Sequence, residues 1–258
     1  MSTHFATARN YSEESENRMH SDGAARTFGF ESALVPGVAV FGHMTRPLIE
    51  TVGAAWLEGH ESEIRLIKPA YDGDTLAVEH VEAGEHLVRC TGRGVLIAEL
   101  RSRAARPPLD PMAELPGGEP VDGKPVIEWD LIRIGEPFPA FAWMPDRSEH
   151  QRYASQVDDD LPIWRGDLLH PHALLSTANR ALSNRFRLPA WLHVGSKMVF
   201  REPVRVGDEI EVRAVPVEKW RRKGHEFIEL YVAYLVGGQV KTEIRHTAII
   251  RMAARPRA

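Results

Sequence analysis

An internal repeat, offset by 134 residues, constrains the fold of this chain more than any other feature of its sequence. Residues 68–78, KPAYDGDTLAV, align with residues 202–212, EPVRVGDEIEV. The same ungapped offset gives nine identities among the 45 positions from 34 to 78. Because one offset joins a helical pattern to a strand–turn–strand pattern, the chain is predicted to contain two copies of one structural unit. The alternative is chance similarity between two α+β segments.

Each copy combines one buried helix with several strands. Residues 37–49, GVAVFGHMTRPLI, are apolar around most of the helix circumference, which is typical of a helix inside a core. Pro36 and Gly37 mark its start, and Pro47 is expected to kink or end it. A second helix is predicted over residues 168–184. Alternating patterns predict strands over 63–68, 74–81, 87–90 and 94–102, and over 197–201, 208–215, 226–235 and 240–251.

The two copies are predicted to be separate domains joined by a linker. Residues 107–125 are rich in proline, glycine and acidic residues and lack an apolar period, so they read as the linker. The domains are then residues 1–106 and 126–258. A helix wrapped by an antiparallel sheet is a small α+β unit, and two such units can pair their sheets edge to edge. The Gly-Asp pairs at 73–74 and 207–208 are expected to form turns.

Composition narrows the class of protein. The 258 residues carry a net charge of −4 and are 43% hydrophobic, which favours a soluble globular protein and gives no support for general nucleic-acid binding. The single cysteine, Cys90, precludes an internal disulfide and favours a reducing, cytoplasmic location. No apolar run approaches the ~18–20 residues of a membrane span, and the N-terminus lacks a signal core. No metal-ligand spacing stands out, so no metal is expected.

Candidate catalytic residues gather near the N-terminus. His20 follows Asn17 by three residues, and Gly37 opens the first predicted helix seventeen residues after His20. Backbone N–H groups at a helix start have no intrahelical partner and can stabilise a carbonyl oxygen as it gains negative charge. A histidine can move a proton near neutral pH. This combination predicts chemistry on a thioester carbonyl.

The same segment carries a family resemblance. The pattern resembles the (R)-specific enoyl-CoA hydratase and MaoC-like dehydratase family, whose hot-dog fold wraps an antiparallel sheet around a long central helix. The duplicated plan resembles the double hot-dog branch of that family. The resemblance rests on Asn17-x-x-His20-x-Asp22, Gly29-Phe30, residues 34–37 (LVPG) and Phe41-Gly42.

The family signature is an aspartate, any residue, an asparagine, a proline, a small apolar residue and a histidine. Carried over residue by residue, the histidine is His20 and the asparagine is Asn17. The proline position holds Arg18 and the aspartate position holds Ser15. A serine hydroxyl is not ionised at neutral pH, so Ser15 cannot take the aspartate's role as a base.

Other acidic residues lie close to this position. Glu14 and Glu16 flank Ser15, but a shift of one residue changes the direction of a side chain, and such acids are usually solvated. Asp22 follows the histidine, where an acid more often serves the start of the next helix. Glu14, Ser15 and Asp22 are therefore uncertain members of the site.

The second half has a degenerate version of the motif. Residues 158–164, DDDLPIW, retain an acid and the proline, but Leu161 and Trp164 occupy the asparagine and histidine positions. The helix start is LLHP in place of LVPG. His170 and His172 are a lesser candidate pair, for which core or surface roles are favoured.

The resemblance implies reversible hydration of a 2-enoyl thioester to a 3-hydroxyacyl thioester, a lyase reaction of fatty acid metabolism. His20 would transfer the proton, Asn17 would orient it or the water, and the N–H groups around Gly37 would hold the thioester oxygen. No cofactor is expected, because coenzyme A or an acyl carrier protein carries the substrate. A homodimer without nucleic-acid or membrane partners is expected. The alternatives are a hot-dog thioesterase, for which Glu50 lies late in the helix, and a non-catalytic acyl-binding or partner protein.

Overall fold

Ten strands of the chain form one sheet. The computed structural model describes residues 2–82 and 84–253. The strand order is β1-β3-β4-β5-β2-β7-β10-β9-β8-β6, and each neighbouring pair is antiparallel. The strands are β1 (Ser2–Thr7), β2 (His60–Leu66), β3 (Thr75–Glu82), β4 (His86–Gly92), β5 (Val95–Ala104), β6 (Phe141–Trp143), β7 (Leu192–Phe200), β8 (Ile210–Arg222), β9 (His225–Val236) and β10 (Gln239–Arg251).

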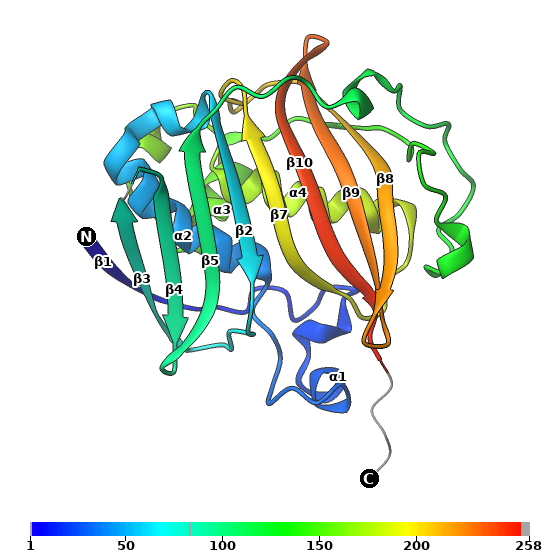
Figure 1. Ribbon diagram of the computed structural model, residues 1–258, viewed down its shortest axis with the longest axis horizontal. Coiled ribbons are helices and arrows are strands. Elements are labelled where there is room, and N and C mark those ends of the chain that lie inside the picture. Colours follow the sequence, from blue (N-terminus) through cyan, green and yellow to red (C-terminus); the bar gives the residue numbers. More distant parts are fainter. Residues whose placement is uncertain (1, 83, 254–258) are drawn as a thin grey trace.

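Two long helices, α2 and α4, lie side by side against one face of the sheet (Figure 1). The α-helices are α1 (Asp22–Thr27), α2 (Gly37–Val52), α3 (Arg147–Gln156) and α4 (Pro171–Arg185). Helix α2 packs on strands of the first half and on β7, and α4 packs on β8, β9 and β10 of the second half. The pairing of β2 with β7, in which Glu63 lies opposite Lys197, makes the two half-sheets continuous. The α+β architecture with two wrapped helices is therefore the predicted one.

The repeat persists down to single hydrogen bonds. In the first half, the N–H of Val35 donates to the carbonyl of Ala70 at 2.9 Å. In the second half, the N–H of Leu169 donates to the carbonyl of Val204, also at 2.9 Å. Both partners are displaced by the 134 residues of the sequence repeat. The offset therefore reflects a real structural duplication, and chance similarity is excluded as its explanation.

The two Gly-Asp pairs form equivalent turns, as predicted. Asp74 Oδ2 accepts from the N–H of Tyr71 at 2.9 Å, and Asp208 Oδ2 accepts from the N–H of Arg205 at 2.8 Å. The glycine of each pair has a positive φ, 79° in the first half and 88° in the second. Glycine adopts this conformation without the steric cost that other residues meet. These residues are structural in both halves.

Most predicted elements are observed, with shifted ends. All eight predicted strands overlap observed ones, and both helices form. Of the two expectations for Pro47, a kink or the end of the first helix, the second is wrong, because α2 continues through Pro47 to Val52. Burial of Leu48 and Ile49 beyond the proline favours continuation. The domain limits at residues 106 and 126 remain a prediction. In the described part of the chain, no helix combines the length and apolar character needed to cross a membrane.

Candidate active site

Asn17 links the motif loop of the first half, residues 15–20, to the second half by hydrogen bonds. It caps the short 3-10 turn Arg18–His20, and its Oδ1 accepts from the N–H groups of Met19 at 3.3 Å and Trp191 at 3.2 Å. Its Nδ2 donates to the carbonyl of Trp191 at 3.1 Å. Because Trp191 supplies one donor and one acceptor, the orientation of the amide is fixed. The link between Asn17 and Trp191 is a structural function that the motif position did not predict.

His20 is held as a neutral ring whose unprotonated nitrogen faces the amide of Asn17. Its Nδ1–H donates to the carbonyl of Leu34 at 2.7 Å, so Nε2 carries the lone pair of the neutral ring. The second N–H of the Asn17 amide reaches this Nε2 at 3.3 Å. Burial lowers the pKa of His20, so the ring is neutral at pH 7. Nε2 can serve as a general base when a bound water replaces the long contact from Asn17.

The start of α2 provides backbone donors beside this ring. Gly37 is the first residue of the helix, and in the described structure the N–H groups of Gly37 and Val38 donate to no protein group. A Cβ at Gly37 would overlap the Cδ1 atom of Leu66, so a larger residue here would displace the Leu66 side chain. Glycine leaves the backbone open to a ligand atom at a point where any other residue would crowd the wall.

Two cavities meet at His20. The first, of about 250 Å³, is mostly apolar and extends past Gly37. The second, of about 450 Å³, is more polar and extends between the motif loop, α3 and α4. Asn17, His20, Pro36, Asn179 and Trp191 line both cavities. A molecule that occupied both would pass directly by the imidazole. The apolar cavity is lined further by Phe30, Leu34, Val40, Leu66 and Ile249, and the polar cavity by Ser15, Tyr153, Gln156 and Ser176.

The uncertain acidic residues and Ser15 lie away from the imidazole or at the cavity mouth. Ser15 is exposed on the rim of the polar cavity, and its hydroxyl donates to the Asn17 carbonyl at 3.4 Å. Glu14 is exposed and lines neither cavity. Glu16 lines the polar cavity, but its side chain is 69% exposed. These positions leave the family's aspartate without an evident replacement in the N-terminal segment.

Asp22 serves the local structure. It begins α1, and its Oδ1 accepts from the N–H of Ala33 at 2.8 Å. Its Oδ2 pairs with Arg26 at 3.2 Å, one helical turn later. Asp22 thereby ties α1 to the segment that leads into α2 and lines neither cavity.

Sequence reasoning missed the second-half residues of this site. Asn179 comes from α4, Trp191 directly precedes β7, and His193 is the second residue of β7. They reach the site because the pairing of β2 with β7 places the second half beside the start of α2. No motif surrounds these residues, so only the three-dimensional pairing identifies them.

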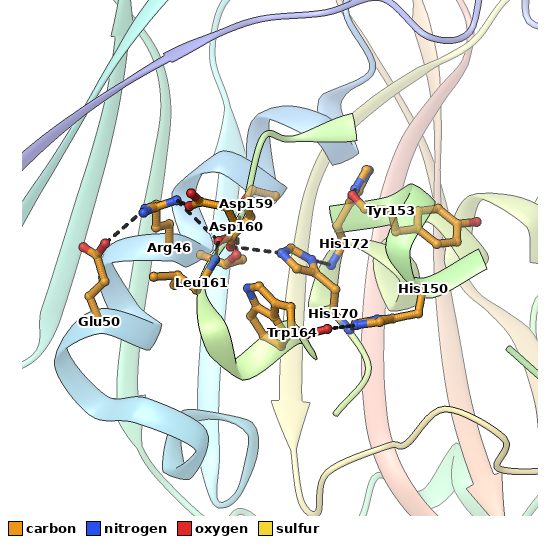
Figure 2. Close-up of polar contacts among 12 residues, drawn as sticks. Arg46, Glu50, His150, Tyr153, Asp159, Asp160, Leu161, Trp164, His170 and His172 are labelled. Carbon is orange, nitrogen blue, oxygen red and sulfur yellow. Dashed lines mark hydrogen bonds and ion pairs between the residues drawn. The ribbon is translucent and has the colours of Figure 1, made fainter. Parts of the chain in front are cut away.

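The equivalent place in the second half is filled by side chains (Figure 2). His170 caps α4, where its Nδ1 accepts from the N–H of His172 at 3.1 Å. Its Nε2–H therefore donates to Asp159, at 3.2 Å. Trp164 packs against the His170 ring with 4.5 Å between ring centroids. The side chains of Asp159, Trp164, His170 and His172 are all buried. His170 and His172 thus have the core roles that the sequence favoured.

Other groups in this cluster are also paired. The hydroxyl of Tyr11 donates to His172 Nε2 at 2.6 Å, because His172 Nδ1 already faces the carbonyl of Tyr153 at 3.0 Å. Glu50, at the far end of α2, pairs with Arg46 at 3.0 Å and lines neither cavity (Figure 2). Glu50 is therefore too remote to activate water near Gly37.

Comparison with known proteins places the fold. No protein-family profile and no curated protein sequence matches the chain. Among solved structures, a candidate MaoC-domain dehydratase from Chloroflexus aurantiacus aligns over 96% of this chain and 94% of its own, with 14% identity and a TM-score of 0.65. A double hot-dog protein from Mycobacterium tuberculosis aligns over 96% and 95%, with 13% identity and a TM-score of 0.61. A candidate oleoyl thioesterase from Lactobacillus plantarum aligns over 96% and 95%, with 11% identity and a TM-score of 0.53. The chain therefore has the double hot-dog fold, shared with MaoC-like proteins.

Proposed function

We propose that this protein is a MaoC-like hydratase or dehydratase that interconverts a 2-enoyl thioester and a 3-hydroxyacyl thioester. The observation that carries the proposal is the position of His20 Nε2. It is an unprotonated imidazole nitrogen at the junction of two cavities, of which Gly37 lines the apolar one and Val38 the polar one, and the N–H groups of both donate to no protein group in the described structure. A general base beside a pair of amide donors is what proton transfer at an enolisable thioester requires.

The groups divide the chemistry of hydration between them. Water attacks C3, and one of its protons passes to His20 Nε2 as the C3–O bond forms. The electron pair of the C2–C3 double bond moves toward the thioester, whose oxygen gains enolate charge. The N–H groups at the start of α2 stabilise that oxygen. The imidazolium then returns the proton to C2, so that one water is added overall; dehydration is the reverse.

The two cavities suit the two parts of an acyl thioester. The apolar cavity accommodates the acyl chain, since Phe30, Leu66 and Ile249 offer no hydrogen bonds. The polar cavity suits the amide-containing arm shared by coenzyme A and acyl carrier proteins. Gln156 Oε1, Ser176 Oγ and Asn179 Oδ1 are shielded there without a hydrogen-bond partner in the described structure. A ligand with amide groups would satisfy these atoms, which are otherwise costly to bury.

Enoyl absorbance tests the proposal. Purified protein is mixed with crotonyl-CoA and longer 2-enoyl-CoAs, and loss of the conjugated absorbance is followed. We expect turnover by the wild type and a loss of at least about 10²-fold in His20→Ala. His86→Ala, on β4 and outside both cavities, is the matched control. If wild type and His20→Ala are equally inactive on coenzyme A and carrier-protein substrates of every length, the protein is not a hydratase.

The same assay separates the alternatives. A thioesterase would release free thiol without any change in enoyl absorbance, but Glu50 lies away from the helix start and is paired with Arg46. A non-catalytic acyl-binding protein would bind the thioester and leave both signals unchanged. A hot-dog thioesterase would need a carboxylate near the helix start to activate water against the carbonyl, and α2 has none that lines either cavity.

A further inference from the structure

The apolar cavity contains a second imidazole that the proposed mechanism has not used. With Ser15 in place of the aspartate, His20 lacks the partner group that would hold the reacting water. Among the residues that line the apolar cavity, the ionisable side chains are His20, Lys68 and His193. His193 is therefore the remaining imidazole that can accept a hydrogen bond in this cavity.

His193 is built into a buried relay. Its Nε2 lies 2.9 Å from Ser196 Oγ, which lies 3.0 Å from His246 Nδ1. The two imidazole rings stack with their centroids 4.4 Å apart. Ser196 and His246 are both buried, so Ser196 fixes the orientation of the His193 ring from behind.

The other nitrogen of His193 faces the start of α2. His193 Nδ1 is shielded from solvent and has no hydrogen-bond partner in the described structure. A Cβ built on Gly37 would lie 3.3 Å from it and would overlap Leu66 Cδ1, which places this nitrogen at the start of α2, beside the Leu66 side chain. An unpaired buried polar atom costs free energy unless a ligand or water satisfies it.

Burial also keeps the ring neutral. It lowers the pKa of His193 to about 4, so the ring carries no charge at pH 7. When His193 Nε2–H donates to Ser196 and the Ser196 hydroxyl donates to His246, Nδ1 is left with a lone pair. We take the relay to run in this direction, which leaves Nδ1 as a neutral acceptor in the cavity.

We propose that His193 is a second catalytic residue, whose Nδ1 accepts a hydrogen bond from the reacting water while His20 Nε2 takes that water's other proton. The inference rests on the proposed hydratase function. The water oxygen bonds to C3, one proton goes to His20 and then to C2, and the remaining hydrogen stays on the new hydroxyl, held by His193. His193 thereby performs the water-holding part of the missing carboxylate's work.

A pair of substitutions tests this role. His193→Asn places an amide oxygen close to the position of Nδ1, whereas His193→Leu fills a similar volume without an acceptor. We expect His193→Leu to lower kcat by about 10²-fold with little change in KM, and His193→Asn to stay within about tenfold of wild type. His86→Leu controls for the loss of a histidine elsewhere in the sheet. Melting temperatures of all variants are compared.

The outcomes separate this inference from the proposed function. An active wild type whose His193→Leu variant keeps its kcat overturns the role of His193 and leaves the hydratase proposal standing. Equal losses in the asparagine and leucine variants overturn it too, because packing alone would then explain them. A wild type without hydratase activity overturns both proposals.

A second variant covers failure of His193→Leu to fold. Ser196→Ala removes the hydroxyl that orients His193 but keeps the imidazole in the cavity. It should lower kcat with KM unchanged. Wild-type kcat in this variant overturns the relay and the role of His193 with it.

Discussion

Removal of the Asn17 side chain should loosen the seam between the two halves. In Asn17→Ala, the N–H groups of Met19 and Trp191 and the carbonyl of Trp191 lose their partner at 3.1–3.3 Å. Loss of an N-cap typically costs about 1 kcal/mol, and each partly buried backbone group left without a partner costs about 1 kcal/mol more. For the cap and the two Trp191 groups, the free energy of unfolding should fall by about 3 kcal/mol.

Urea unfolding measures this loss. With a slope of about 3 kcal/mol per molar, the midpoint should shift down by about 1 M. Asn17→Asp is the matched variant, because it keeps the acceptor and loses both Nδ2 donors. Its carboxylate beside His20 Nε2 should raise the pKa of His20 and move the acidic limb of the kcat profile to higher pH. An Asn17→Ala midpoint equal to that of wild type would refute the reasoning.

Three further outcomes follow from the same geometry. Gly37→Ala should fold but lose at least about 10²-fold in kcat/KM, because its methyl group would take space from Leu66 and the substrate oxygen. Unchanged kinetics would contradict the placement of the oxygen. Ser15→Asp should raise hydratase activity, at most about tenfold since the position is exposed, and a fall in steady-state rate would count against the motif assignment. Acid should destabilise the fold below pH 6.5, because the unfolded chain binds protons that buried neutral histidines exclude. Burial lowers the pKa of His172 to about 3. The unfolding free energy lost between pH 7.5 and 5.5, measured by thermal melts, should therefore be about 1 kcal/mol smaller in His172→Phe than in wild type.

Most of the architecture could be predicted from the sequence, because the core elements have strong local patterns. The apolar circumference of residues 37–49 and the alternation in the longer strands predicted α2 and most of the sheet. Strand β1, with the sequence STHFAT, escaped prediction because an edge strand buries little. Helix α2 passes Pro47 because tertiary packing outweighs a single lost hydrogen bond.

The site was only half accessible to sequence reasoning. His20 and Gly37 share a short segment with a recognisable spacing, and the structure places both on the apolar cavity. Asn179 and His193 come from the other half through the pairing of β2 with β7, and nothing local marks them. The structural work of Asn17 was equally hidden, since its partner Trp191 lies 174 residues away.

The packed start of α4 sets how many ligands one chain can hold. His170, Pro171 and His172 occupy the space that Gly37 leaves open in the first half. A symmetric pair of units would offer two equivalent entrances, whereas this fused chain should saturate at one equivalent of acyl thioester. The second half instead contributes Asn179, Trp191 and His193 to this single site, so substitutions there act on the ligand and on the base of the first half.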